Sequence, residues 1–298
     1  RGGGTVKHPE QVTESWHGMT NELKDWTSIE TPQDIRLVVA DMDGTLLDAD
    51  SELPVGFWPL LDRLEQLGIA FVPASGRQYQ TLQQMFARAG RPMSVIAENG
   101  NVVAVDGEVV ETHGVNHEIA DETISMVDAT SEDLGLVVCG LDSAYIQRTD
   151  APFVAEASKY YKALTEVKDL REVLRYPDEK ILKLAIFDFG DAEAMARNEL
   201  GFVSDPYEYV VSGAHWVDIM DKHVDKGEGV KAIQRALGVT RAQTAAFGDY
   251  LNDIGMLNEA EFSFAMANAH EGVKKAARYL APANTEEGVI RVVDRLVG

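Results

Sequence analysis

Four short segments of the chain hold side chains suited to phosphoryl transfer. They are Asp41-Met-Asp-Gly-Thr45, Ser75-Gly-Arg77, Lys226-Gly227 and Gly248-Asp-Tyr-Leu-Asn-Asp253. A carboxylate can attack a phosphoryl group and form an aspartyl-phosphate, and a second carboxylate two residues on can serve as acid and then as base. A hydroxyl and an ammonium group can bind phosphate oxygens. These residue types therefore indicate covalent phosphoryl chemistry on an aspartate.

The acidic side chains of this set require a cation beside them. Asp249 and Asp253 add carboxylates of the kind that Mg²⁺ binds, since it is a hard cation that prefers oxygen. A carboxylate approaching a phosphate dianion is repelled, by about 4 kcal/mol for unit charges ~4 Å apart at an effective dielectric near 20. Lys226 alone does not balance several carboxylates. The pattern therefore predicts Mg²⁺ as the cofactor.

Each segment taken alone is a weak signal. A D-x-D pair is usually a solvated turn, and Ser-Gly or Gly-Asp after a strand is usually only a turn. A Lys-Gly pair at the start of a helix usually lies on the surface. The order of the four segments, and their positions at the ends of predicted strands, favour the joint interpretation as one site.

An alternating pattern of strands and helices positions these segments. Short apolar runs predict buried strands over 35–40, 69–74, 94–97, 244–247 and 262–266, with apolar stripes at helical spacing between them. Such repeats form a parallel sheet with right-handed crossovers. Ligands of open α/β sheets bind at the carboxyl ends of the strands, so we expect the four segments to meet in space.

The alternation is interrupted in the middle of the chain. Asp106-Gly107 is a two-residue hairpin signal between apolar runs. Beyond it, helical stretches near 118–129, 152–163 and 191–199 mix with strands near 134–140, 143–148, 181–188 and 207–220. This rhythm predicts an α+β domain inserted into an α/β core. We expect an N-terminal extension over 1–34, a core over 35–115 and 216–298, and the insert over 116–215.

The N-terminal extension has an apolar stripe. Trp16, Met19, Leu23 and Trp26 recur at helical spacing. The pattern predicts a short helix docked on the body, with a partner-binding or dimerising segment as the alternative.

Composition and charge narrow the function classes. Apolar residues make up 45% of the 298, which is enough to bury a core and excludes disorder as the main state. The formal charge of −22 argues against nucleic-acid and anionic-membrane partners and favours small phosphates over polyanions as substrates. No apolar run is long enough to predict a membrane span.

The only cysteine, Cys139, excludes an internal disulfide, and we expect a reducing, cytoplasmic location. Oligomeric state is not predicted.

On these motifs the chain resembles the haloacid dehalogenase superfamily of phosphohydrolases, within it the Cof-like group with a type C2 cap. The four motifs are matched in order by Asp41-Met-Asp-Gly-Thr-Leu-Leu47, Ser75-Gly-Arg77, Lys226-Gly227 and Gly248-Asp-Tyr-Leu-Asn-Asp-Ile-Gly-Met-Leu257. Secondary signatures match at 95–100, 265–269 and 284–289. The resemblance covers about residues 35–298. It implies a Rossmann-like core with a cap inserted between the second and third motifs, where the change of rhythm also predicts an insert.

The resemblance also implies roles for single residues. Asp41 would be the nucleophile and a Mg²⁺ ligand, and Asp43 the general acid/base with its main-chain carbonyl on the metal. Asp249 would be the second carboxylate ligand, and Asp253 would support the metal directly or through water. The phosphate-binding and supporting positions would be Thr45, Ser75, Gly76, Lys226 and Asn252.

The sequence thus predicts a Mg²⁺-dependent phosphatase that acts on small phosphomonoesters, such as sugar phosphates. A phosphomutase on the same core is the nearest alternative. A phospho-acceptor signalling module, or a non-catalytic protein on the same fold, is more remote. In the cap, Arg148 and Lys183 could contact the polar end of a substrate, be solvated, or form ion pairs within the cap.

Overall fold

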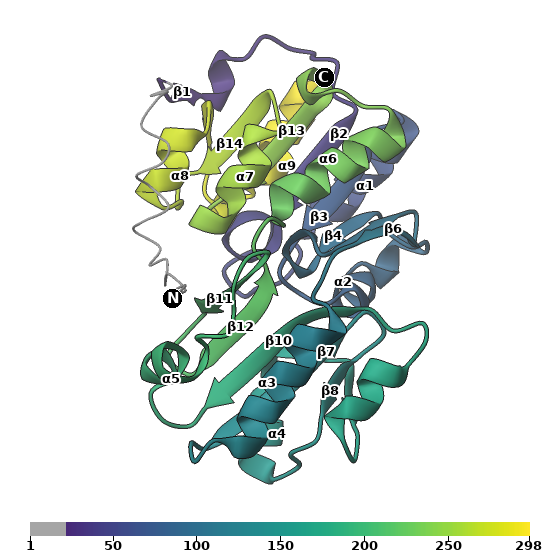
Figure 1. Ribbon diagram of the computed structural model, residues 1–298. Coiled ribbons are helices and arrows are strands. Elements are labelled where there is room, and N and C mark those ends of the chain that lie inside the picture. The colour runs from purple at the N-terminus through teal and green to yellow at the C-terminus, as the bar shows by residue number, and fades with distance from the viewer. Residues whose placement is uncertain (1–21) are drawn as a thin grey trace. The chain divides into compact units, whose positions relative to one another are not determined.

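The computed structural model describes residues 22–298, which divide into two compact units (Figure 1). Residues 22–76, Leu82–Glu111 and Asp225–Gly298 form the core. The inserted unit consists of Arg77–Thr81 and Thr112–Val224. Trp16 and Met19 of the N-terminal stripe lie outside the described residues.

The core is built on a sheet of nine described strands in the order β1-β15-β14-β13-β2-β3-β4-β5-β6. In this spatial order, the seven strands β1, β15, β14, β13, β2, β3 and β4 are each parallel to their neighbours, and β5 runs antiparallel to β4. Figure 1 shows β2, β3, β13 and β14 in this central part. The strands are β1 (Lys24–Asp25), β2 (Leu37–Asp41), β3 (Ala70–Ala74), β4 (Val95–Ala97), β5 (Val102–Val105), β6 (Glu108–Thr112), β13 (Thr244–Gly248), β14 (Phe262–Met266) and β15 (Tyr279–Ala281).

Amphipathic helices join these strands. α1 buries Leu60, Leu61 and Leu64, and the chain then turns at Gly68, whose φ is +71°. α9 likewise buries a stripe of valines and a leucine along one face. This spacing places apolar side chains on one side of a helix, which the sheet then covers. The core helices are α1 (Phe57–Gln66), α6 (Lys226–Leu237), α7 (Ile254–Asn258), α8 (Glu271–Ala276) and α9 (Gly288–Val297); α2 (Tyr79–Met85) has residues in both units.

The start of the described chain differs from the predicted helix. Lys24 and Asp25 form β1, which pairs in parallel with Tyr279 and Leu280 of β15, and Trp26–Ser28 form a single tight turn. The spacing of Leu23 and Trp26 was therefore misleading, because an edge strand can form wherever a neighbouring strand offers free backbone groups.

The inserted unit has a second sheet of six described strands in the order β11-β12-β10-β7-β8-β9. Alternate residues of β7 enter different apolar clusters: Leu136 and Val138 pack with α3 and α5, whereas Val137 and Cys139 pack with α4. Since alternate residues of a strand point to opposite faces, helices cover both faces of this sheet. The elements are β7 (Leu134–Gly140), β8 (Ala144–Ile146), β9 (Leu164–Glu166), β10 (Ile181–Asp188), β11 (Tyr207–Val211), β12 (Trp216–Asp221), α3 (His117–Ala129), α4 (Ala151–Tyr160) and α5 (Ala192–Glu199).

The end of the insert lies later in the chain than the predicted boundary at 215. β12 pairs with β10 and β11, so its residues belong to the inserted sheet, and the core resumes at Asp225. The physical reason is that β12 buries Trp216, Val217 and Ile219 in the apolar clusters of the insert.

No helix in the described part of the chain is both long and apolar enough to cross a membrane.

Candidate active site

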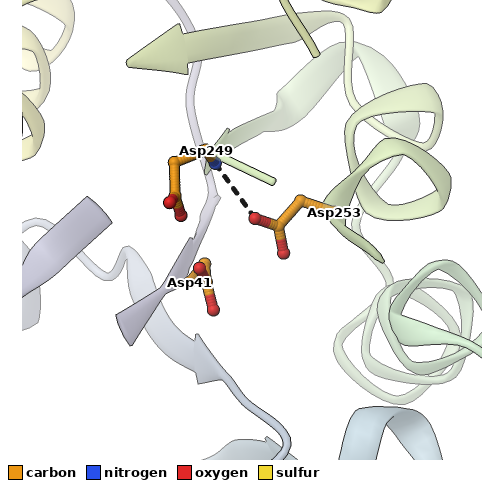
Figure 2. Close-up of side chains that lie close together, drawn as sticks. All are labelled: Asp41, Asp249 and Asp253. Carbon is orange, nitrogen blue, oxygen red and sulfur yellow. Dashed lines mark hydrogen bonds between the residues drawn. The ribbon is translucent and has the colours of Figure 1, made fainter. Parts of the chain in front are cut away.

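Three carboxylates gather at the carboxyl ends of neighbouring core strands. Asp41 ends β2, Asp249 directly follows β13, and Asp253 ends the short turn Leu251–Asp253. β2 and β13 are parallel neighbours with Ala40 paired to Phe247, so their carboxyl ends lie at the same edge of the sheet. One carboxylate oxygen from each aspartate lies within 4.8 Å of the others. Figure 2 shows the three side chains around a common point.

Lys226 joins two of these carboxylates. Its Nζ donates to Oδ1 of Asp41 and to Oδ1 of Asp253, each at 2.8 Å. The lysine is the first residue of α6, and the preceding Asp225 caps the helix by accepting from the backbone N–H of Glu228. The Lys226 side chain is only 1% exposed, so its ammonium group is shielded from solvent and contacts the carboxylates of the site.

Backbone and hydroxyl donors fix the carboxylates of Asp253 and Asp249. Oδ2 of Asp253 accepts from the backbone N–H of Asp249 at 3.0 Å (dashed in Figure 2) and from that of Tyr250 at 3.2 Å. The hydroxyl of Thr45 donates to Oδ1 of Asp249 at 2.8 Å. Thr45 thus contacts an aspartate of the cluster.

Gly44 allows the first loop to lie against Asp249. Its φ is +77°, and a Cβ at this position would lie 2.3 Å from Oδ2 of Asp249. A side chain is excluded by both the left-handed backbone and the lack of space. The carbonyl of Gly44 accepts from Nδ2 of Asn268 at 2.8 Å, which holds the loop from the other end.

Burial raises the pKa values of the carboxyl groups. It raises the pKa of Asp41 to about 6, against the attraction of Lys226, and a hydrogen bond to the Asp249 carboxyl adds to the effect. Burial also raises the pKa of Asp253 to about 6, and the charge of Asp41 contributes. Burial likewise raises the pKa of Asp249. For Lys226, burial lowers the pKa, but Asp41 and Asp253 together outweigh it and the pKa is raised.

This donor set fits a hard divalent cation. The carboxylates of Asp41, Asp249 and Asp253 supply closely spaced oxygens, the ligands that Mg²⁺ prefers. Their three negative charges face the one positive charge of Lys226, which leaves an excess of negative charge at the site. A divalent cation would offset it.

The remaining predicted residues lie on the same loops. Asp43 and Gly44 belong to the turn Met42–Leu46, and the Asp43 side chain is exposed. Ser75 is buried directly after β3, and Gly76 follows it. Asn252 is exposed on the turn that carries Asp253.

Sequence reasoning missed two asparagines that hold the loops together. Oδ1 of Asn268 accepts from the backbone N–H of Asn284, and Nδ2 of Asn284 donates to the carbonyl of Leu47 at 3.0 Å. Together with the bond from Asn268 to Gly44, this chain of contacts supports the first loop from β14 and β15. Both asparagines stand in the signatures at 265–269 and 284–289, which could have pointed to them.

In the inserted unit, Arg148 and Lys183 form ion pairs with their own domain. Arg148 contacts Asp133 at 2.6 Å and Asp150 at 2.5 Å. Nζ of Lys183 lies 3.6 Å from Asp218 on the adjacent strand, and both side chains are largely buried. Of the alternatives that the sequence left open, the structure therefore favours ion pairing within the cap.

Three carboxylates and one buried lysine thus lie at the strand ends of an α/β core that carries an insert. This arrangement is typical of phosphoryl-transfer enzymes. The comparisons with known proteins agree. A family model described as haloacid dehalogenase-like hydrolase matches residues 38–293. The 5-amino-6-(5-phospho-D-ribitylamino)uracil phosphatase YbjI of Escherichia coli is 31% identical over 274 residues, covering 88% of this chain and 96% of the relative. A phosphoglycolate phosphatase of Methanopyrus kandleri is 28% identical, covering 88% and 97%.

Solved structures show the same fold. A crystal structure from Eubacterium rectale has a TM-score of 0.79 at 26% identity and covers 88% of this chain and 98% of that one. TM0651 from Thermotoga maritima has a TM-score of 0.77 at 24% identity, with coverage of 88% and 97%. The chain belongs to the haloacid dehalogenase-like hydrolases, in the Cof-like group with a C2 cap. It is a phosphatase, a phosphoric monoester hydrolase, and the predicted fold class and enzyme class are confirmed.

Proposed function

We propose that this phosphatase is Mg²⁺-dependent and hydrolyses small phosphomonoesters through an aspartyl-phosphate on Asp41. One observation carries the proposal. Asp41, Asp249 and Asp253 each place a carboxylate oxygen within 4.8 Å of the others, and Lys226 contacts two of the three. A nucleophile, a cation site and a fixed positive charge therefore share one edge of the core sheet.

In the first half of the reaction, a carboxylate oxygen of Asp41 attacks phosphorus and the bond from phosphorus to the ester oxygen breaks. Asp43 gives its proton to the departing alkoxide. The Lys226 ammonium, 2.8 Å from Oδ1 of Asp41, keeps the nucleophile ionised and offsets negative charge that develops on the phosphoryl oxygens. Ser75 binds those oxygens through its hydroxyl, and Thr45, Gly76 and Asn252 support the loops that surround them.

In the second half, Asp43 takes a proton from water and the water oxygen attacks phosphorus. The bond from phosphorus to Asp41 breaks, which restores the carboxylate and releases inorganic phosphate. Asp41, Asp249 and Asp253, with the main-chain carbonyl of Asp43, would hold Mg²⁺. When bound, the cation supplies Lewis-acid stabilisation of the phosphoryl charge.

The substrates we propose are small phosphorylated metabolites, including sugar phosphates. The names of two relatives support this, since one acts on a phosphoribityl pyrimidine and one on phosphoglycolate. The charge of −22 also disfavours large polyanions, which must approach the whole surface. A reducing, cytoplasmic location is part of the proposal, supported by Cys139, which is buried and not in a disulfide.

The test is hydrolysis of p-nitrophenyl phosphate by the purified protein, with Mg²⁺ and after treatment with a chelator. We expect turnover that the chelator abolishes and Mg²⁺ restores. Undiminished turnover after chelation would contradict the metal requirement. A panel of phosphorylated metabolites scored by kcat/KM then identifies the substrate. Product analysis with a hexose 1-phosphate separates hydrolysis, which releases inorganic phosphate, from a phosphomutase reaction, which gives the 6-phosphate.

A further inference from the structure

The turn between β4 and β5 has an unusual backbone. Glu98, Asn99 and Gly100 follow one another with φ values of +50°, +54° and +100°. A residue other than glycine is strained in the left-handed region, asparagine the least, and it persists there only where the surroundings enforce it. Such strain is common at functional sites, so the contacts of this turn are informative.

On one side the turn contacts the Ser75 loop. The backbone N–H of Asn99 donates to the carbonyl of Ser75 at 3.0 Å, and the N–H of Ser75 donates to the carbonyl of Ile96 at 2.9 Å. The side-chain amide of Asn99 lies against Gly76, because a Cβ on Gly76 would stand 3.1 Å from its Nδ2. Asn99 therefore contacts both residues of the predicted phosphate-binding pair.

On the other side the turn contacts the start of α6. A Cβ on Gly100 would lie 2.1 Å from the carbonyl oxygen of Asp225 and 3.5 Å from the backbone nitrogen of Lys226. Only glycine fits this approach, and its φ of +100° is one that other residues rarely adopt. The turn thus packs directly on the residue that caps α6 and on the residue that supplies the ammonium group.

The interior of the turn is closed by its own residues. Asn101 donates to the carbonyl of Glu98 from both its backbone N–H, at 3.1 Å, and its Nδ2, at 2.9 Å, and both residues are 5% exposed. Among the described residues, no donor reaches the buried Oδ1 of Asn99. Asn101 thus closes the turn without the side chain of Asn99, whose amide lies against Gly76.

We propose that Asn99 is a positioning residue of the phosphatase reaction. It holds Ser75 and Gly76 at a fixed place relative to Lys226, through a turn that contacts both segments. The inference rests on the proposed function, in which Ser75 and Lys226 bind the same phosphoryl group. Because misplacement by about 1 Å can cost as much as 10²-fold in rate, a small contact of this kind can be important.

The first test is Asn99→Gly, which removes the amide and keeps a residue that accepts positive φ. Wild-type hydrolysis of p-nitrophenyl phosphate is measured first, since its absence would be a failure of the proposed function and not of this inference. We expect kcat/KM to fall roughly 10-fold or more, weaker inhibition by inorganic phosphate, and an unchanged urea unfolding curve. Asp106→Gly is the matched control: it replaces another residue at positive φ (+51°), in the hairpin turn after β5, and should leave activity unchanged.

A double-mutant cycle separates positioning from a general structural role. If Asn99 acts through the Ser75 loop, Asn99→Gly should cause less than about a 2-fold further loss in a Ser75→Ala background. Gly76→Ala gives a reciprocal test, because its methyl group would crowd the Asn99 amide. It should lower kcat/KM, and Asn99→Gly should partly restore it. Full activity of Asn99→Gly, or independent effects in both pairs, would overturn the inference.

Discussion

Lys226 and Asp253 form an ion pair that is completely buried, with Nζ 2.8 Å from Oδ1 and side-chain exposures of 1% and 0%. Asp41 takes the second bond of the same ammonium group. In a low-dielectric interior, such a pair is stable only when every charge has a partner. The buried lysine therefore links the folding of the core to the state of the proposed nucleophile.

Replacing Lys226 by methionine should destabilise the protein strongly. The change leaves the carboxylate of Asp253 buried without its cation, and breaking a buried pair in this way costs roughly 3–5 kcal/mol. Urea unfolding of the metal-free protein measures the effect. The double variant Lys226→Met, Asp253→Asn should recover part of the loss, because the stranded charge is removed as well.

Lys231→Met is the matched control on the same helix. Lys231 pairs with Glu228 at 3.2 Å, but both side chains are more than two-fifths exposed. Exposed pairs contribute about 0–1 kcal/mol, so this variant should unfold almost as the wild type does. An equal effect of the two substitutions would contradict the special role of the buried pair.

Stabilisation by Mg²⁺ should depend on pH. Burial raises the pKa values of Asp41 and Asp253 from 3.8 to about 6, so the folded protein binds these protons more tightly than the unfolded chain does. Their contribution to stability is fully present below pH 3.8 and is lost as the pH rises through about 6. Mg²⁺ competes with the same protons, so it should raise Tm little at pH 5 and clearly more at pH 8.

Thermal unfolding with and without Mg²⁺ across this pH range measures the effect. Asp253→Asn should reduce the Mg²⁺-dependent increase in Tm, whereas Asp62→Asn, which alters an exposed carboxylate on α1, should leave it unchanged. An increase of the same size at pH 5 and pH 8 would show that these carboxylates are not the binding groups.

Gly44→Ala should impair catalysis far more than folding. The added methyl group would stand 2.3 Å from Oδ2 of Asp249, so that the carboxylate or the loop must move. We expect kcat/KM to fall by about 10²-fold, since displacement of a reacting group by ~1 Å has effects of this size. Steady-state kinetics with p-nitrophenyl phosphate provides the measurement.

Gly68→Ala isolates the backbone cost of that substitution. Gly68 has nearly the same φ, +71°, but nothing lies within 4 Å of its added Cβ. The Gly68→Ala variant should lose about 1 kcal/mol of folding stability, because alanine is strained in the left-handed conformation, and it should keep its activity. If both alanine variants retained activity, the close contact of Gly44 with Asp249 would have no catalytic importance.

That Asp41 and Asp249 lie close together could be predicted from the sequence, because the strands that precede them can be recognised there. Asp41 and Asp249 each follow a short apolar run, and parallel neighbours bring such ends together. Lys226 could be placed for a related reason, since it opens the helix that precedes β13. The roles of these residues in the reaction, and those of Asp43, Ser75 and Asn252, stay predictions.

Other features depend on contacts that form only in the folded protein. Asn268 and Asn284 act on the backbone carbonyls of Gly44 and Leu47, which only the folded sheet brings near them. β1 was missed because a two-residue edge strand is defined by its partner, β15, and has too few side chains to show an alternation.

The most direct test of the account is whether Asp41 carries the phosphoryl group during turnover. Wild-type protein is mixed with excess substrate and Mg²⁺, quenched in acid within one turnover, and digested for mass spectrometry. The account predicts one phosphoryl group on the Asp41 side chain, lost on treatment with hydroxylamine and absent from Asp41→Asn, which should also be inactive. Turnover by Asp41→Asn near the wild-type rate, or label only on another residue, would contradict it.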